Sequence, residues 1–205
     1  MNENKVKAFS QKADVLNKFV VRGTVVSKYE TDAALLVIIR SCPFTSYADY
    51  PSIIFYDKEL ANKFNREVKV GERVSVEGYV NTSKKHPEGT LISTGFKKEF
   101  TRLQAAFENG EYVEDANQVM ISGTIMQDPF VTDDVTILTI KTFSSAETLV
   151  IFKAVAFNRY ANMAKNKKAG DKVRVFCFVK TQDKKTTNQK HSYQSFILRG
   201  IESIE

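Results

Sequence analysis

The chain has 205 residues, of which 42% are hydrophobic and 26% charged, and it carries a formal net charge of +6. Length and composition fit a folded protein with one large domain or two domains of about 100 residues each. No apolar run approaches the roughly 20 residues of a membrane span, and residues 1–19 lack the apolar core of a signal peptide. We therefore expect a cytoplasmic protein with no membrane partner.

The charge is unevenly distributed along the chain. Residues 1–98 carry 16 Lys and Arg against 11 Asp and Glu, and residues 118–205 carry 13 against 8. Between them, residues 99–117 carry 1 against 5. Two basic blocks around an acidic spacer suit a nucleic-acid partner.

The chain also repeats itself at an offset of about 100 residues. Three pairs of segments match in the same order: VVRGTVV with MISGTIM, LAN with YAN, and GERVSVEGYVNT with GDKVRVFCFVKT. This pattern indicates a duplicated domain. We predict a first domain over 1–98 with an N-terminal arm over 1–18, an acidic linker over 99–117, and a second domain over 118–205.

Each copy begins with a strand that contains a glycine, which indicates a bulge or a sharp bend. The predicted elements of the first copy are strands over 19–28, 34–41 and 52–56, a helix over 57–68, and strands over 71–82 and 90–96. Those of the second copy are strands over 118–127, 135–142 and 148–157, a helix over 158–168, and strands over 170–181 and 192–201. Five strands with one helix between the third and the fourth is the order of an OB-fold. The sequence predicts an all-β protein with short helices, built from two tandem five-stranded Greek-key OB-folds.

The fourth strand of the second copy has an unusual outer face. Alternation places Val173, Val175, Cys177 and Val179 toward the core and Arg174, Phe176, Phe178 and Lys180 outward. Outward phenylalanines between cations suit stacking on bases beside a phosphate backbone. The alternative is a hydrophobic face that packs against the other copy or another subunit.

Two kinds of loop offer further contacts. The loop over 41–52 holds Phe44, Tyr47 and Tyr50, which either stack on bases or tuck the loop onto its barrel. The loop between the fourth and fifth strands is basic in both copies, with Lys84 and Lys85 in one and Lys184, Lys185 and Lys190 in the other. OB-folds use this loop for oligonucleotides.

Signals of catalysis are poor. The HPE at 86–88 lacks the PCxxC that a zinc deaminase requires, and two histidines with two distant cysteines do not form a metal site. Asp128, Asp133 and Asp134 surround a proline in a predicted turn, which accounts for them. We expect no enzyme activity, no metal and no cofactor.

Two segments resemble the bacterial-type single-stranded DNA-binding proteins: KAVAFNRYANMAKNKKAGDKVRVFCFVKTQ over 153–182 and IIFYDKELANKFNREVKVGERVSVEGYVNTS over 53–83. The likeness covers roughly 19–98 and 118–204, and the tandem arrangement looks like members found in some bacteria, phages and plasmids. It implies that single-stranded DNA lies along strands two to five. The DNA-binding residues that it implies are Lys153, Phe157, Arg174, Phe176, Phe178, Lys180, Lys184, Lys185, Lys190 and Tyr193.

The sequence departs from this family in three respects. The chain has no tryptophan for stacking. It ends in RGIESIE, so the acidic tail by which the family recruits partners is not expected. On its fourth strand the first copy has Ser75, Glu77, Tyr79 and Asn81 in place of Arg, Phe, Phe and Lys. Tyr79 is the one stacking candidate left there.

The resemblance implies sequence-independent binding and protection of single-stranded DNA in replication, recombination or DNA transfer. The family commonly assembles four OB-folds, which implies a homodimer here, with a monomer whose two copies pack together as the alternative. Two other functions stay open: an OB-fold adaptor that binds a replication or transfer protein, and RNA binding.

Overall fold

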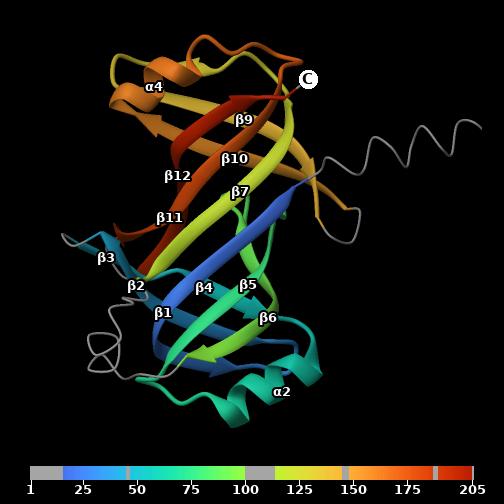
Figure 1. The fold of residues 1–205 in the computed structure, drawn as a ribbon, viewed down its shortest axis with the longest axis vertical. Helices are drawn as coiled ribbons and strands as arrows, with labels where there is room; N and C mark the ends of the chain where they lie inside the picture. Colours follow the sequence, from blue (N-terminus) through green and yellow to red (C-terminus); the bar gives the residue numbers. More distant parts are fainter. Residues whose placement is uncertain (1–15, 45–46, 100–113, 145–147, 187–188, 205) are drawn as a thin grey trace, which may run out of the picture. The chain divides into compact units, whose positions relative to one another are not determined.

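The computed structural model describes residues 16–44, 47–99, 114–144, 148–186 and 189–204 (Figure 1). Most of the predicted N-terminal arm and of the predicted acidic linker lies outside these residues. None of the described helices is long and apolar enough to cross a membrane.

The first OB-fold is a closed barrel with one helix. Its elements are β1 (Asn17–Glu30), β2 (Leu35–Phe44), β3 (Tyr47–Asp49), β4 (Ser52–Phe55), α2 (Lys58–Glu67), β5 (Arg73–Asn81) and β6 (Thr90–Glu99). The strand order is β3-β2-β4-β6-β5-β1, and the additional pairing of β1 with β2 closes the barrel. β4 and β6 are parallel, while the other pairs are antiparallel.

The second OB-fold repeats this plan. Its elements are β7 (Ala116–Ile125), β8 (Phe130–Val131), β9 (Val135–Phe143), β10 (Leu149–Phe157), α4 (Asn158–Ala164), β11 (Lys172–Thr186) and β12 (Gln189–Ser203). The order is β7-β11-β12-β10-β9-β8, and β7 also pairs with β9. The predicted fold class is confirmed: the protein is all-β with two tandem OB-folds, to which β3 and β8 add one short strand each.

A glycine allows the first strand of each copy to pair with two neighbours. In β1, residues up to Thr24 pair with β5, and residues from Thr24 onward pair with β2. A Cβ on Gly23 would lie 2.1 Å from the carbonyl oxygen of Arg40. A Cβ on Gly123 in β7 would lie 2.3 Å from that of Lys141. The glycine of the repeated GT pair is therefore required where each barrel bends and closes.

Aromatic side chains fill the two cores. In the first OB-fold the ring of Phe64, from α2, lies with its centroid 4.7 Å from that of Phe55 and 4.8 Å from that of Phe96. In the second, the rings of Phe152 and Phe196 lie 4.8 Å apart. Cys177 is buried on the valine face of β11, and burial raises the pKa of its thiol. It therefore acts as a small apolar core residue.

Contacts along the chain define two compact units whose bounds differ from the sequence repeat. One unit comprises Phe19–Gln118 together with Val179–Ser195; the other comprises Val119–Phe178 and Phe196–Glu205, with the described residues before Phe19. The tip of the β11–β12 hairpin, Val179–Ser195, thus belongs to the second repeat in the sequence. By its contacts it belongs to the unit that contains the first OB-fold.

Replacing Gly23 by alanine tests the closure of the barrel. The added Cβ meets a backbone carbonyl that cannot move without breaking strand pairing, so Gly23→Ala should lower the free energy of unfolding by at least about 2 kcal/mol. Gly95→Ala is the control, because a Cβ there would come no closer than 3.9 Å to its neighbours. Urea unfolding monitored by circular dichroism measures both. Equal effects of the two substitutions would contradict the close-approach argument.

Candidate nucleic-acid interface

The clearest candidate surface is the outer face of β9 and β10 in the second OB-fold. In β10 the side chains alternate strictly: Val150, Phe152, Ala154 and Ala156 are buried, and the residues between them point outward. The outward residues of β10 are Leu149, Ile151, Lys153, Val155 and Phe157, and those of β9 are Val135, Ile137, Thr139, Lys141 and Phe143. We refer to these ten residues as the β9–β10 face.

The register of the two strands mixes cations with apolar groups on this face. Lys141 lies opposite Ile151, and Lys153 lies opposite Thr139. Directly opposed residues on one face have Cβ atoms about 5 Å apart. Lys141 therefore has the apolar Ile151 directly opposite it, and Lys153 lies between Ile151 and Val155 on the outer face of its own strand. Phe157, at the end of β10, keeps 39% of its surface exposed.

The face extends onto β8 and includes residues that the sequence reasoning missed. Phe130, which pairs with Ile137, is 60% exposed. The outer face of β9 could not be identified from the sequence, because two threonines of this strand point inward. Thr136 donates to the carbonyl of Ala161 (3.2 Å) and Thr142 donates to that of Ser122 (2.8 Å). Strand alternation predicts that such polar residues face outward. The exposed apolar residues of β10 gave a usable signal, because Leu149 and Ile151 alternate with Lys153.

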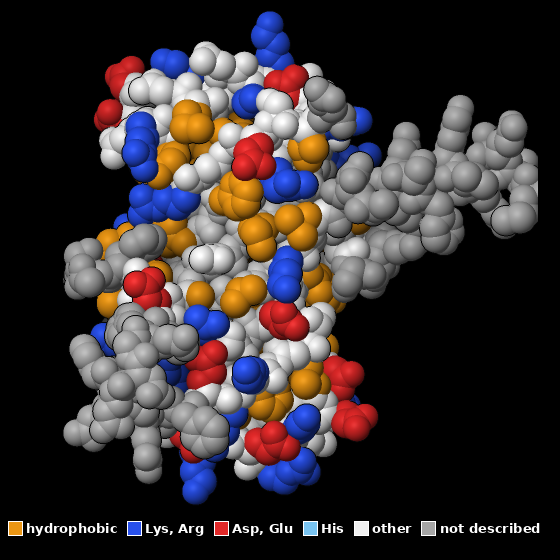
Figure 2. All heavy atoms as spheres, viewed as in Figure 1, with side chains coloured by type: hydrophobic (Ala, Val, Ile, Leu, Met, Phe, Trp, Pro, Cys, Tyr) orange, Lys and Arg blue, Asp and Glu red, His pale blue; other side chains and the backbone are white. Residues whose placement is uncertain are grey.

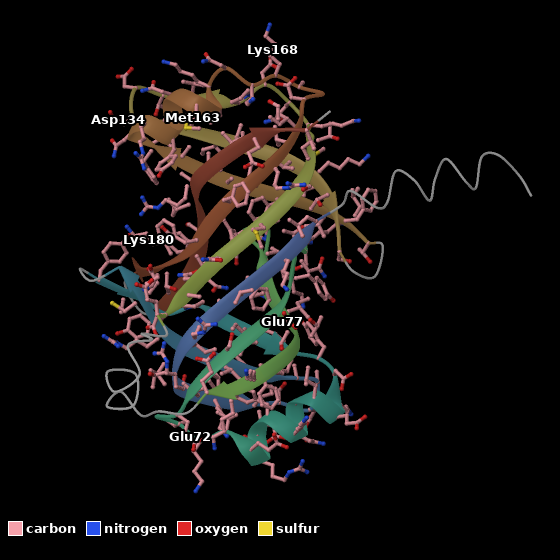
Figure 3. All side chains as sticks on the ribbon, in the orientation of Figure 1. Glu72, Glu77, Asp134, Met163, Lys168 and Lys180 are labelled. Atoms are coloured by element: carbon pink, nitrogen blue, oxygen red, sulfur yellow. The ribbon has the colours of Figure 1, made fainter. Side chains whose placement is uncertain are left out.

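On β11 the structure separates the four outward-facing candidates. Arg174 and Phe176 are half-buried. Lys180 is exposed (Figure 3). Arg174 donates weakly to Ser122 Oγ at 3.4 Å, and it lies 3.7 Å from a carboxylate oxygen of Glu202. The Phe176 ring lies across Gly200 of β12, with its Cδ2 only 3.3 Å from where a Cβ on that glycine would stand.

The predicted outward position of Phe178 is wrong, because this side chain is only 4% exposed. The guanidinium of Arg199 lies over its ring, 4.7 Å from the centroid. Cys177, Phe178 and Val179 are all buried, so the alternation ends here. Phe178 is the last β11 residue of its unit, and from Val179 the strand belongs to the unit of the first OB-fold. The alternation of inward and outward residues in one barrel therefore does not extend to Phe178.

The predicted basic loop of the second copy is mostly strand. Lys184 and Lys185 lie in β11 and Lys190 in β12, and their side chains are outside the described residues. Tyr193 is half-buried in β12.

The base of this hairpin is bound to the first OB-fold. The side chain of Gln194 accepts from the N–H of Ser52 (2.8 Å) and donates to its carbonyl (3.3 Å), as a neighbouring strand would. Asn117 forms the same two-way pair with Val179 (2.8 and 2.9 Å). Burial raises the pKa of Asp49, while the backbone of Thr181 and the charge of Lys180 lower it. Lys180 therefore has an acidic neighbour in this unit.

The first OB-fold presents tyrosines. Tyr47 and Tyr50 are exposed, Tyr79 is half-buried, and Lys84 and Lys85 are exposed in the loop over 82–89. Phe44 pairs with Tyr47 across β2 and β3, and its side chain lies outside the described residues.

Sequence reasoning missed two further tyrosines in this copy. Tyr29 and Tyr56 are exposed by 58% and 53%. Tyr29 pairs with Leu36 and Tyr56 directly follows β4. The parallel pairs Ile53–Leu91 and Ala154–Phe196 place Tyr56 at the position of Phe157.

Carboxylates neutralise much of the positive charge on the sheet of the first OB-fold. Arg22 lies 2.9 Å from Glu99, Arg73 pairs with both Glu99 and Asp115, and Lys98 lies 2.8 Å from Glu72. The ammonium of Lys98 and the N–H of Lys69 hold the pKa of Glu72 below its usual value. On the face shown in Figure 2, acidic side chains lie among the Lys and Arg side chains, and hydrophobic side chains are interspersed with both.

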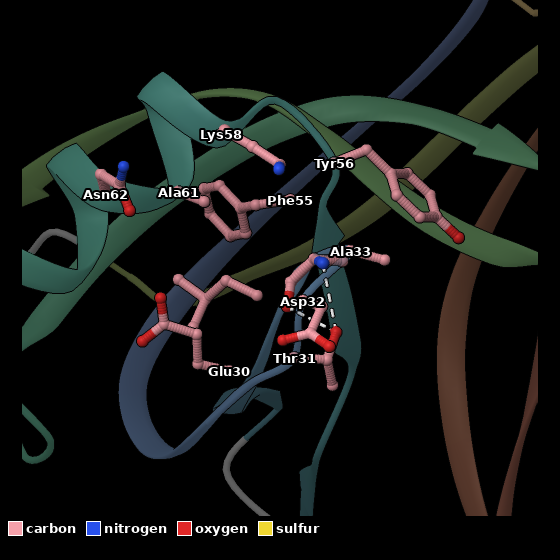
Figure 4. A pocket seen from close by; sticks show the side chains of 11 residues that line it. Glu30, Thr31, Asp32, Ala33, Phe55, Tyr56, Lys58, Ala61 and Asn62 are labelled. Atoms are coloured by element: carbon pink, nitrogen blue, oxygen red, sulfur yellow. Dashed lines mark hydrogen bonds between the residues drawn. The ribbon is translucent and has the colours of Figure 1, made fainter.

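A pocket of about 510 Å³ opens in the first OB-fold between the turn after β1 and helix α2 (Figure 4). Its polar lining includes Glu30, Asp32, Lys58 and Asn62. Two carboxylates against one lysine make it unfavourable for a phosphate. We therefore do not include it in the candidate interface.

Comparisons with known proteins agree on the fold. No family model matches the chain, and no curated protein matches its sequence. Among solved structures, the wild-type single-stranded DNA binding protein from Thermus aquaticus superposes with a TM-score of 0.65 at 14% identity, over 93% of this chain and 94% of that one. A deletion mutant of the same protein gives 0.66 at 14% identity, over 94% and 96%. The likeness thus extends over nearly the whole tandem OB-fold chain, and at this identity it is a likeness of fold.

Substitution of two phenylalanines tests the corrected assignment. Phe178→Ala should lower the free energy of unfolding by about 3–5 kcal/mol, because it removes a buried ring. Phe157→Ala should lower it by clearly less, because that side chain keeps 39% of its surface exposed. Thermal and urea unfolding of both variants decide this. A Phe178→Ala variant as stable as the wild type would mean that its ring is not part of the core.

Proposed function

We propose that this protein binds single-stranded DNA with little sequence preference, chiefly through the β9–β10 face of its second OB-fold. The observation that carries the proposal is the register of that face, in which Lys141 and Lys153 alternate with exposed apolar and aromatic side chains. The fold similarity to a single-stranded DNA binding protein supports it.

The chemistry of this face fits a single strand better than a duplex. A single strand exposes both base rings and phosphates, and stacking on an aromatic side chain contributes about 1–3 kcal/mol per base whatever the base. Phe157 and Phe143 offer such rings, and Lys141 and Lys153 offer ammonium groups to the phosphates. Neutralised phosphates release counterions, so affinity should fall as salt is raised.

The first OB-fold should contribute less to binding. It offers exposed Tyr47, Tyr50, Lys84 and Lys85, but Glu77 occupies on β5 the place of Phe176 (Figure 3). Two arginines of its sheet, Arg22 and Arg73, are engaged with Glu99 and Asp115. A carboxylate beside a phosphate costs binding energy, so we expect the second copy to dominate.

The proposed biological role is to protect single strands during replication, recombination or DNA transfer, as a homodimer with four OB-folds. A second candidate function is that of an adaptor for another protein. The exposed Phe130, Leu149 and Ile151 favour it, because large apolar side chains at the surface also suit a protein interface. The two candidates differ in their response to salt and to oligonucleotides.

Titration with a fluorescein-labelled oligo(dT) tests the main proposal. Fluorescence anisotropy at low and at moderate salt should show tight binding that weakens steeply with salt, and oligo(dC) should bind within roughly an order of magnitude of oligo(dT). Oligo(U) in parallel tests the RNA alternative. Absent or salt-independent binding would refute the proposal.

Two matched variants locate the binding surface. Phe157→Ala should weaken oligo(dT) binding by about 5- to 150-fold, the equivalent of one stacking contact. Tyr56→Ala, at the corresponding position of the first OB-fold, should cost clearly less. Light scattering of both variants reports the oligomeric state. If Phe157→Ala leaves affinity intact and changes the molar mass, the β9–β10 face is a protein interface.

A further inference from the structure

A second group of side chains in the second OB-fold lies beyond the β9–β10 face. Arg159 and Tyr160 come from α4, and Arg199 comes from β12. The guanidinium carbon of Arg159 lies 4.7 Å from the centroid of the Tyr160 ring, and that of Arg199 lies 5.9 Å from the same centroid. We call these three residues the arginine–tyrosine cluster.

The cluster is exposed and has a hydroxyl group at its centre. Arg159 donates to the hydroxyl oxygen of Tyr160 at 2.6 Å. This bond and the charge of Arg159, followed by those of Arg199, lower the pKa of the Tyr160 phenol. Both arginines are exposed and Tyr160 is half-buried. Two guanidinium groups thus lie beside one ring, and two neighbouring cations favour the binding of an anion.

The first OB-fold has no such cluster at the corresponding positions. The repeated LAN and YAN segments align Glu59 and Leu60 with Arg159 and Tyr160. The parallel pairs Ile53–Leu91 and Ala154–Phe196 align the following strands, which puts Thr94 at the position of Arg199. One copy therefore has an acid and a hydroxyl group where the other has two arginines. The shared barrel therefore does not require the cluster, which is a feature of the second copy alone.

The chain path brings the cluster close to a stacking candidate. β10 ends at Phe157 and α4 begins at Asn158, whose backbone is left-handed with a φ of 51°. Arg159 follows the exposed Phe157 by only two residues, on the other side of this sharp turn. A nucleotide whose base stacks on Phe157 would thus have its phosphate within reach of α4.

We infer that the arginine–tyrosine cluster is a phosphate-binding site that takes a backbone phosphate of the bound single strand. Arginine presents paired N–H donors that match phosphate oxygens, and the Tyr160 hydroxyl can donate a further hydrogen bond. The inference rests on the proposed function in naming the strand as the source of the phosphate. The site itself rests on the geometry of the three side chains.

The test compares two charge-matched double variants. Arg159→Gln with Arg199→Gln should weaken oligo(dT) binding about 10-fold or more at low salt, in line with the loss of charged hydrogen bonds. It should also make the plot of log affinity against log salt shallower by about 0.7 for each lost phosphate contact. Lys165→Gln with Lys168→Gln removes the same charge from the same unit, and should change both quantities much less. Equal effects of the two double variants would overturn the inference.

Two further measurements keep the outcome clear. Arg199 covers Phe178, so Arg159→Gln alone serves as the variant that leaves this contact in place, and it should still weaken binding. The unfolding temperature in sodium phosphate, compared with sodium chloride at equal ionic strength, tests the site without DNA. Phosphate should stabilise the wild type more than the double arginine variant.

These results separate the two proposals. If the wild type does not bind oligo(dT), the proposed function fails, while a phosphate-dependent rise in unfolding temperature that needs both arginines still supports the site. If oligo(dT) binds and Arg159→Gln binds as tightly as the wild type, the strand is not the source of the phosphate. If phosphate stabilises all variants equally, there is no phosphate site.

Discussion

The barrel of each copy depends on one close approach between backbones. β1 and β7 each pair with two different strands, and the change of partner occurs beside Gly23 and Gly123. Because no side chain fits between the glycine and the facing carbonyl, the strand can bend there and the sheet can close. Closure fixes which residues of the neighbouring strands face outward. In the second barrel the carbonyl that faces the glycine belongs to Lys141 of the β9–β10 face.

The duplicated frame carries two different surfaces. Gly95 and Gly200 occupy equivalent places on the last strand of each barrel, and the residue that lies over them differs. Over Gly95 it is Glu77, whose side chain comes no closer than 3.9 Å to a Cβ placed there, and over Gly200 it is the ring of Phe176. The same position thus bears a charge in one copy and a ring in the other. Together with the Arg22–Glu99 and Arg73–Asp115 pairs, this substitution makes the first surface less suited to a polyanion.

The fold was predictable because the sequence pattern of each element occurs twice in the chain. The strands, the helix between the third and fourth strands, and the glycines all recur at corresponding positions. The outer face of β10 was predictable in part, since Lys153 and Phe157 stand out from an apolar run. That of β9 was not, because Thr136 and Thr142 satisfy their hydroxyl groups on backbone carbonyls inside the barrel. No local pattern distinguishes such threonines from exposed ones.

Other residues depend on contacts that are remote in sequence. Strand alternation alone cannot show that Arg199 covers Phe178, or that Arg159 and Arg199 share one tyrosine ring. The second arrangement requires the pairing of β10 with β12, which brings together residues about 40 apart. The arginine–tyrosine cluster could only have been suspected from the sequence by asking where the two copies differ in charge.

The bonds at the base of the β11–β12 hairpin bear on how the chain folds during synthesis. The N–H of Ser52 donates to the side chain of Gln194, which comes 142 residues later. The carboxylate of Asp49 accepts a hydrogen bond from the backbone of Thr181. The start of β4 in the first barrel therefore lacks this partner until almost the whole chain has left the ribosome. Unpaired backbone groups on a strand are a site at which chains associate wrongly. The boundary between the repeats in the sequence is thus not a boundary between independently completed folds, and the last part of the second copy finishes the first.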